Sequence, residues 1–261
     1  MKKYLLLIGL FFSACAPTKN MRPAGLPHAE ANDTRTGEAF FKQAVSYNWR
    51  ERDSLALEYA SVGQVPDFYF NFVPVTTTFT RADGKEVKVT FYVAPDYFMV
   101  GTNSSWARVP ITPMAAQKIA DAYGCFLPTS LMVDAIYKAS TVKLAPVPMY
   151  AYRDSTVTMW QHHLIIEGQR RGKKGLISGI KKDVVLSNKV LEHQRPNRVA
   201  IYGWHTLDGK PIQPVYAGHV NWYVDYSHGI RLIAKKVKID GNWVDYTALF
   251  GEGCETKMLR Y

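Results

Sequence analysis

The chain of 261 residues is short of cysteine, of long apolar runs and of internal repeats, and each shortage excludes a class of protein. Its three cysteines, Cys15, Cys125 and Cys254, are too few for the disulfide framework of a small secreted scaffold. After Phe12 no apolar run has the length of a transmembrane helix, so none is predicted. No sequence period recurs, which excludes a solenoid or a propeller.

The N-terminus has the features of an export signal. Two lysines precede an apolar stretch from Tyr4 to Phe12, and the small residues Ser13 and Ala14 come directly before Cys15. This ending resembles a bacterial lipobox, which implies a signal peptide over residues 1–14 and acylation of Cys15, for example by palmitate. The alternative is an ordinary cleaved signal in which Cys15 has no role. The lipobox implies a location in the bacterial cell envelope, anchored to a membrane on its periplasmic or outer face.

Composition predicts a packed globular body with an anionic neighbour. Apolar residues make up 47% of the chain and aromatic residues 13%, which is typical of a globular protein. The formal net charge of +10 favours lipid head groups, glycan carboxylates or phosphates as partners. Nucleic acid is not expected, because the chain carries an export signal. Residues 15–36, rich in Pro, Ala, Asn and Thr, predict a tether without regular structure.

Hydrophobic patterns over residues 37–261 predict a single α+β domain. Residues 37–62 have helical spacing, and residues 67–80 are aromatic and β-branched, as strands are. An Asp83-Gly84 turn leads into a second strand, and residues 97–101 are expected to continue the same sheet.

Capping residues predict a central helical pair. Thr112 and Gly124 bound the first helix, and the second is expected over residues 128–140. From residue 150 onwards the pattern predicts strands, with hairpin turns at Asp208-Gly209 and Asp240-Gly241. The predicted fold is therefore an antiparallel sheet with hairpins around a helical pair.

Histidines crowd into the second half of the chain. Six of the seven are His162, His163, His193, His205, His219 and His228. Histidine is a common general base and metal ligand, although any single one is more often a core or surface residue. In an extended strand His219, Tyr223 and Asp225 share one face. We expect one concave site in this region, with candidate binding residues Trp204, His205, Tyr226 and Arg231.

Cys125 is the candidate nucleophile. It precedes the second expected helix, whose dipole would lower the pKa of the thiol. Cys125 and the run His219-Val220-Asn221-Trp222-Tyr223 resemble the NlpC-type, papain-like cell-wall cysteine peptidases. That resemblance covers under a fifth of the chain. It implies Cys125 as nucleophile and His219 as base, with Asp225 or His228 orienting the base. The alternative is a buried Cys125 or a disulfide with Cys254.

Residues 205–231 also suggest two other chemistries. The run Tyr226-Ser227-His228-Gly229-Ile230-Arg231 is similar to the Ser-His-Gly-Cys-x-Arg end of the L,D-transpeptidase motif, but the nucleophilic cysteine is missing. Gly229 is expected to supply a backbone conformation that other residues resist. His219 and Asp225, with His205 or His228, offer ligands suited to Zn²⁺, although no metal motif is present. We therefore expect no cofactor, with zinc as the alternative.

Residues 169–183 form a basic segment. Its basic residues are Arg170, Arg171, Lys173, Lys174, Lys181 and Lys182. A solvated loop is the simpler interpretation. If the segment has a function, its first four basic residues are candidates for binding an anionic polymer.

The leading hypothesis is a lipid-anchored envelope hydrolase that cleaves peptide or amide bonds of cell-wall material by a Cys-His mechanism. The competing hypotheses are a non-enzymatic lipoprotein that binds glycan or an anionic wall polymer such as peptidoglycan, and a His/Asp zinc hydrolase. The surroundings of Cys125 separate them. An open groove with a histidine in hydrogen-bond reach favours the thiol enzyme, whereas burial favours the binding protein.

Overall fold

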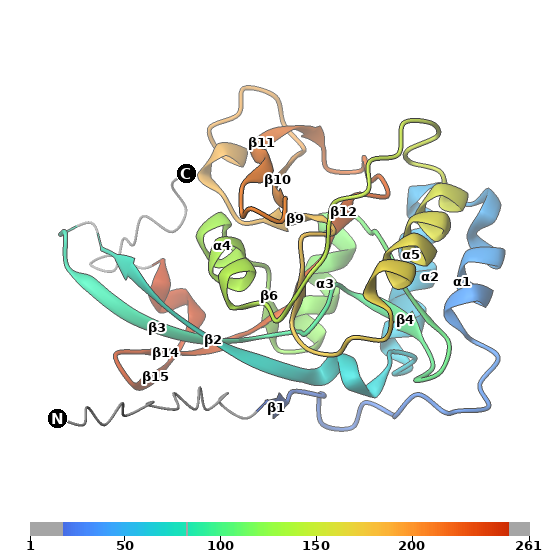
Figure 1. Cartoon of the computed structure of the whole chain (residues 1–261), viewed down its shortest axis with the longest axis horizontal. Helices are drawn as coiled ribbons and strands as arrows, with labels where there is room; N and C mark the ends of the chain where they lie inside the picture. Colours follow the sequence, from blue (N-terminus) through green and yellow to red (C-terminus); the bar gives the residue numbers. More distant parts are fainter. Residues whose placement is uncertain (1–17, 82, 251–261) are drawn as a thin grey trace, which may run out of the picture.

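The computed structural model describes residues 18–81 and 83–250. The signal peptide, Cys15 and Cys254 lie outside the described residues. Five α-helices and two main sheets make up the described part, which confirms the α+β class. Figure 1 shows the long hairpin of β2 (Asn71–Thr80) and β3 (Glu86–Val93) along one side, and the helices in the middle and at the opposite end. The sheet that contains β9 (Lys182–Val185) and β12 (His228–Gly229) lies above them.

The predicted helix over residues 37–62 is two helices, so that prediction is wrong in its middle. Helix α1 covers Gly37–Gln43 and helix α2 covers Trp49–Ser61. Between them a 3₁₀ turn, Ala44–Ser46, ends at Tyr47, whose backbone is extended. Asn48 and Glu51 then form a capping box that starts α2 afresh.

The larger sheet has seven strands in the order β1-β2-β3-β13-β6, with β14 and β15 branching from β3. Its strands are β1 (Lys19–Asn20), β2 (Asn71–Thr80), β3 (Glu86–Val93), β6 (Cys125–Phe126), β13 (Ile233–Ala234), β14 (Lys236–Ile239) and β15 (Asn242–Asp245). The hairpins at Asp83-Gly84 and Asp240-Gly241 are confirmed.

Two strand predictions near this sheet need correction. Residues Asp67–Phe70 are a 3₁₀ helix, and the strand begins only at Asn71. Residues 97–101 do not continue the sheet, because β4 (Met99–Gly101) pairs only with β5 (Trp106–Arg108).

The central helical pair is confirmed as α3 (Pro113–Ala122) and α4 (Ser130–Ala139). The hydroxyl of Thr112 caps α3, and Thr129 caps α4 in the same way. The expectation of strands from residue 150 missed a helix, α5 (Thr156–Arg170). Ser155 caps α5 and places His162 and His163 on its buried face.

The smaller sheet carries the later hairpin. Its order is β11-β10-β9-β12, and its strands are β9 (Lys182–Val185), β10 (Arg198–His205), β11 (Pro211–Val220) and β12 (His228–Gly229). The turn at Asp208-Gly209 joins β10 to β11, as predicted. A short parallel pair, β7 (Val142–Lys143) and β8 (Ile177–Ser178), forms a separate sheet. The 3₁₀ helix Asn188–Val190 packs on β10 and β11, and the 3₁₀ helix Tyr246–Leu249 packs on β6 through Tyr246 and Phe126.

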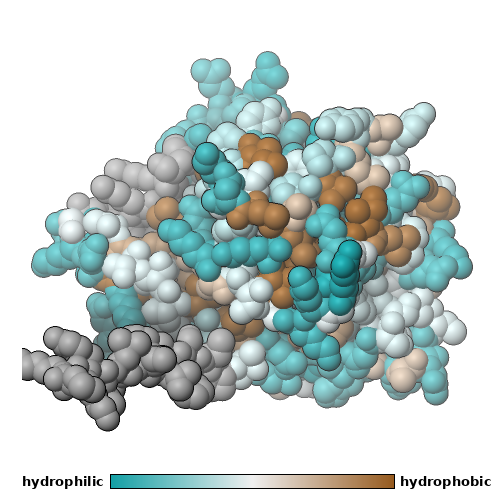
Figure 2. Space-filling model, viewed as in Figure 1, coloured by the Kyte–Doolittle hydropathy of each residue, from teal (hydrophilic) through white to brown (hydrophobic). Residues whose placement is uncertain are grey.

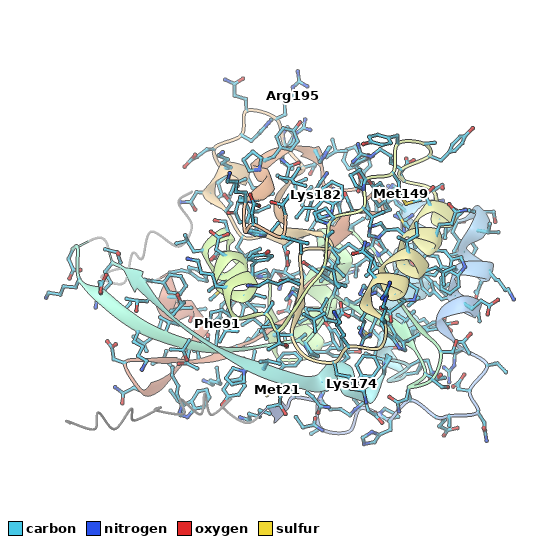
Figure 3. All side chains as sticks on the ribbon, viewed as in Figure 1. Met21, Phe91, Met149, Lys174, Lys182 and Arg195 are labelled. Atoms are coloured by element: carbon cyan, nitrogen blue, oxygen red, sulfur yellow. The ribbon has the colours of Figure 1, made fainter. Side chains whose placement is uncertain are left out.

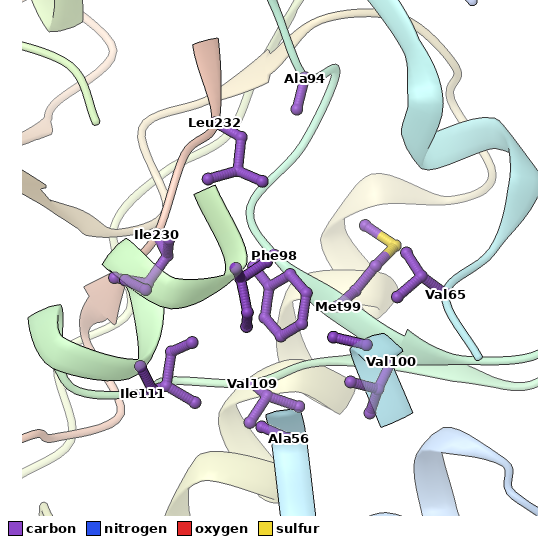
Figure 4. Packing of buried hydrophobic residues seen from close by; sticks show 14 of the residues in the cluster. Ala56, Val65, Ala94, Phe98, Met99, Val100, Val109, Ile111, Ile230 and Leu232 are labelled. Carbon is purple, nitrogen blue, oxygen red and sulfur yellow. The ribbon is translucent and has the colours of Figure 1, made fainter. Parts of the chain in front are cut away.

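One continuous apolar cluster joins these layers. Phe98, Met99 and Val109 are buried next to Ile230 and Leu232 from the far end of the chain (Figure 4). Burying such side chains is the main favourable contribution to folding. Hydrophilic residues cover much of the face viewed in Figure 2, with hydrophobic patches between them.

Residues 18–36 differ from the predicted tether, because they contact the domain. Strand β1 pairs with β2, and the Arg22 guanidinium lies 2.6 Å from Asp67 and over the ring of Phe70. This segment packs closely enough that a side chain at Gly63 would meet Pro27.

Candidate functional site

Cys125 is a buried core residue. It has no exposed surface, and its Sγ donates to the Tyr123 carbonyl at 3.4 Å. Burial raises the pKa of the Cys125 thiol to about 12. The predicted lowering of this pKa is therefore wrong. Its physical basis is also missing, since α4 begins only at Ser130 and Thr129 already caps it.

The structure does not bring Cys125 together with His219. Cys125 lies on β6, paired with Ala234 of β13, whereas His219 lies on β11 of the other sheet. Within the described ranges, no hydrogen bond or ion pair joins Cys125 to a histidine. The thiol is free. By the criterion set above, its burial favours the binding protein.

His219 and Asp225 do line a common cavity, which we call the His219 pocket. This cavity of about 270 Å³ is lined by Arg153, Lys182, Gln213, Tyr216, His219, Tyr223 and Asp225. Strand pairing explains why Lys182 and Gln213 meet at this pocket. Lys182 of β9 pairs with Gly203 of β10 on one side and with His228 of β12 on the other. Gly203 in turn pairs with Gln213 of β11. Gln213 and Lys182 therefore flank a glycine in one row across the sheet.

Asp225 is the carboxylate of the pocket and is almost fully buried. Its Oδ1 accepts from the Ser227 backbone N–H at 2.8 Å and from the Ser227 hydroxyl at 2.5 Å. Its Oδ2 accepts from Arg153 Nη2 at 3.0 Å. Burial acts to raise the pKa of Asp225, but the neighbouring His228, the Ser227 hydrogen bonds and Lys182 hold it below the ordinary value. Asp225 is thus held as an anion.

Two imidazoles and a phenol surround this carboxylate. The His219 ring lies 4.8 Å from that of Tyr223 and 5.6 Å from that of His228, measured between centroids. Burial lowers the pKa of His219, and burial together with Asp225 raises the pKa of Tyr223 to about 12. His228 lies deeper, and its Nε2 has no hydrogen-bond partner among the described residues.

Lys182 supplies a cation to the pocket. The residue is 7% exposed, and its Nζ lies 5.1 Å from the Trp204 ring. Across the described part of the chain, its ammonium donates no hydrogen bond. Burial lowers the pKa of Lys182, and Asp225 opposes this shift. An ammonium group that lines a cavity without an acceptor can donate to a ligand.

Several predicted binding residues lie elsewhere. His205 does not line the pocket, because its Nε2 contacts Asp134 Oδ1 at 2.9 Å and its ring stacks on Tyr137. Trp204 and Tyr226 are buried behind the pocket, where the Tyr226 hydroxyl accepts from the Met149 N–H. The expected single concave surface therefore holds His219, with His228 beneath it, but not His205.

Arg231 and Gly229 have packing roles. Arg231 is buried and donates to the carbonyl oxygens of Ala94 and Ile177, so its guanidinium is engaged within the fold and does not line the His219 pocket. Gly229 has no positive φ, contrary to the expectation of a special backbone conformation. Its lack of a side chain is needed for space instead, because a Cβ there would lie 2.4 Å from the Tyr97 ring.

The basic segment is divided between two places. Lys181 and Lys182 are buried, so the interpretation as a solvated loop fails for them. Arg170 and Lys174 line a different cavity of about 580 Å³, next to Trp106 and Glu167. Figure 3 shows Lys182 in the upper part of the molecule and Lys174 near the bottom. Arg171 and Lys173 line neither cavity.

Sequence reasoning missed Arg153, Lys182, Gln213 and Tyr216 as pocket residues. Lys182 stood out only as one of six basic residues, although the β-branched residues Val184 and Val185 that follow it are typical of a strand. Arg153 comes from the irregular segment before α5 and is close to Asp225 only in the folded chain. No sequence signal links these two positions.

A zinc site would need at least three donor side chains grouped around one point. Within residues 18–81 and 83–250, no three His, Cys, Asp or Glu side chains are grouped closely enough to hold a metal ion. In the same residues, no helix combines the length and apolarity needed to cross a membrane.

The chain was compared with known proteins on three levels. It matches no protein-family model, no curated protein and no solved structure.

Proposed function

We propose that this protein is a lipid-anchored component of the bacterial cell envelope that binds an anionic glycan or wall polymer in the His219 pocket. The observation that carries the proposal is Lys182, a 7% exposed cation that lines the pocket and has no acceptor among the described residues. A carboxylate or phosphate of the ligand would supply that acceptor.

Exposed aromatic rings around the pocket support a sugar ligand. Tyr216 lines the pocket and is 44% exposed. Trp222 is 43% exposed and lines a neighbouring cavity that shares Tyr223 with the His219 pocket. Rings that keep one face in water, with a polar group at the edge, offer large apolar contacts at a wet site. Together with Lys182 they suit a polymer that carries both sugar faces and negative charge.

The prediction concerns the charge of Lys182. Lys182→Gln should weaken the binding of uronic-acid oligomers or muropeptides at least tenfold, because a charge-assisted hydrogen bond contributes about 1.5–3 kcal/mol. Titration calorimetry on the detergent-solubilised full chain measures this directly.

Lys210→Gln is the matched control. It removes the same charge from a side chain that is 84% exposed and lies outside the pocket, so affinity should stay unchanged. The proposal fails if Lys182→Gln binds as tightly as the unaltered protein. It also fails if oligomers with neutralised acid groups bind as tightly as the charged ones.

A further inference from the structure

The His219 pocket places three kinds of group together. Lys182 is a cation at one wall, His219 is a nitrogen base, and Tyr223 is a phenol whose ring centroid lies 4.8 Å from that of His219. Tyr223 donates only a long hydrogen bond of 3.4 Å to Asp225 Oδ2. The groups come from β9, from β11 and from the segment after β11, so the fold and not local sequence brings them together.

We infer that this pocket is the active site of a lyase for polymers of uronic acids, in which His219 removes the proton beside the sugar carboxylate and Tyr223 protonates the leaving oxygen. The inference rests on the proposed function, because it needs the sugar carboxylate bound at Lys182. It goes beyond binding by naming the substrate class and the reaction.

The reaction is a β-elimination that balances without a further reactant. The C–H bond on the ring carbon that bears the carboxylate breaks, and its proton passes to the unprotonated ring nitrogen of His219. The electron pair forms a C=C bond to the neighbouring ring carbon. The C–O bond from that carbon to the next sugar breaks, and the departing oxygen takes the Tyr223 proton. Solvent then carries the proton from His219 back to Tyr223.

Each pocket group has a matching task in this step. Removing the proton leaves extra negative charge on the carboxylate, and a fixed cation such as Lys182 stabilises that charge. The environment keeps His219 available as a base and Tyr223 available as an acid, since it moves their two pKa values apart.

Other bond cleavages fit the pocket less well. Glycoside hydrolysis ordinarily uses two carboxyl groups that flank the bond, and Asp225 is the single carboxylate among the residues that line this pocket. Asp225 is also engaged by Ser227 and Arg153. Thiol-dependent hydrolysis would need Cys125, which is buried on the other sheet.

The experiment incubates the full chain in detergent with polygalacturonate, alginate or hyaluronan. We expect an unsaturated product from at least one polymer, seen as new ultraviolet absorbance and as fragments whose masses sum to that of the parent. His219→Gln and Tyr223→Phe should each lower turnover about 100-fold or more, within the range for general acid–base catalysis, with affinity changed less than about threefold. His193→Gln is the matched control. His193 lies outside the pocket, so the variant should turn over the polymer as fast as the unaltered protein.

The outcomes separate the two proposals. Binding of all three polymers without an unsaturated product overturns the lyase and leaves the binding function standing. Fragments heavier by one water overturn it in favour of hydrolysis. Turnover that survives both substitutions overturns the assignment of acid and base. Absence of binding to all three polymers, with muropeptides still bound through Lys182, overturns the lyase and leaves the binding function standing. Absence of binding to the polymers and to muropeptides overturns both proposals.

Discussion

At the scale of the residue, burial decides what a reactive side chain can do. Cys125 and Lys182 are both mostly buried, yet the thiol packs in the core and the ammonium lines a cavity. Desolvation disfavours the charged form of each group. For Cys125 this prevents formation of the thiolate, which is the nucleophilic form. For Lys182 the nearby Asp225 counteracts the effect.

Cys125 should therefore resist alkylation in the native protein. With its pKa raised to about 12, the thiol should react with iodoacetamide at pH 7.5 at least 100-fold more slowly than in urea, where a free cysteine has a pKa of about 8.5. Peptide mass spectrometry measures labelling at Cys125 separately from the other cysteines. Rapid labelling of the native protein at pH 6 would revive the nucleophile hypothesis.

At the scale of the element, α5 carries two histidines into the core. His162 is fully buried and His163 is 4% exposed, where it stacks on Trp160. Burial lowers the pKa of both, that of His163 to about 3, and the charges of Lys181 and Arg108 act in the same direction. In the unfolded chain both would take up protons near pH 6.5. The unfolded state therefore binds more protons in acid.

Stability should consequently fall as the pH drops below about 6.5. The loss approaches 1.4 kcal/mol per pH unit for each histidine that stays neutral in the folded state. Burial raises the pKa of Asp183 to about 6. Below pH 6 its folded-state carboxyl takes up a proton more readily than the unfolded one, so its contribution to stability rises and offsets part of this loss.

The variant His163→Gln isolates one histidine. Between pH 6 and 4 it should reduce the slope of unfolding free energy against pH by about 1.4 kcal/mol per pH unit, which corresponds to one proton. This holds whatever the effect of the substitution on stability at pH 7. Urea unfolding at a series of pH values gives both slopes, and the Asp183 contribution cancels in the comparison. Equal slopes would show that His163 takes up its proton in the folded state.

At the scale of the whole molecule, the N-terminal segment fixes where a lipid would hold the domain. Residues 18–36 pack on the domain through β1 and Arg22. Cys15 is three residues before Thr18, a span of about 10 Å at most. Thr18 lines the cavity that contains Arg170 and Lys174. A lipid on Cys15 would hold this cavity, which Asp96 and Glu167 line together with Arg170 and Lys174, close to the bilayer surface.

Cys15→Ser should release the protein from membranes and abolish labelling by palmitate, because the acyl chains supply the anchoring energy. Fractionation of cells that express the variant tests this. Cys254→Ser is the control and should remain in the membrane fraction. Membrane retention and palmitate labelling of Cys15→Ser would refute the lipobox.

Local sequence determined most of the elements of this fold. Thr112, Thr129 and the Asp-Gly turns act on their immediate neighbours, so capping and turn chemistry predicted the helical pair and three hairpins. The break at Tyr47 and helix α5 were missed. Both carried a local signal, since Asn48 and Glu51 form a capping box that restarts the helix and Ser155 caps α5.

Sequence also determined which histidines and acids to examine, since His219, Asp225 and His228 lie within ten residues and converge in the structure. Only the tertiary structure decided that Lys182 and Arg153 join them and that Cys125 does not. The reason is physical: Lys182 and His219 are 37 residues apart, Arg153 and Asp225 are 72 apart, and Cys125 and His219 are 94 apart. Such separations along the chain carry no information about proximity until strands pair. The burial that sets the pKa of a thiol or an ammonium exists only after packing.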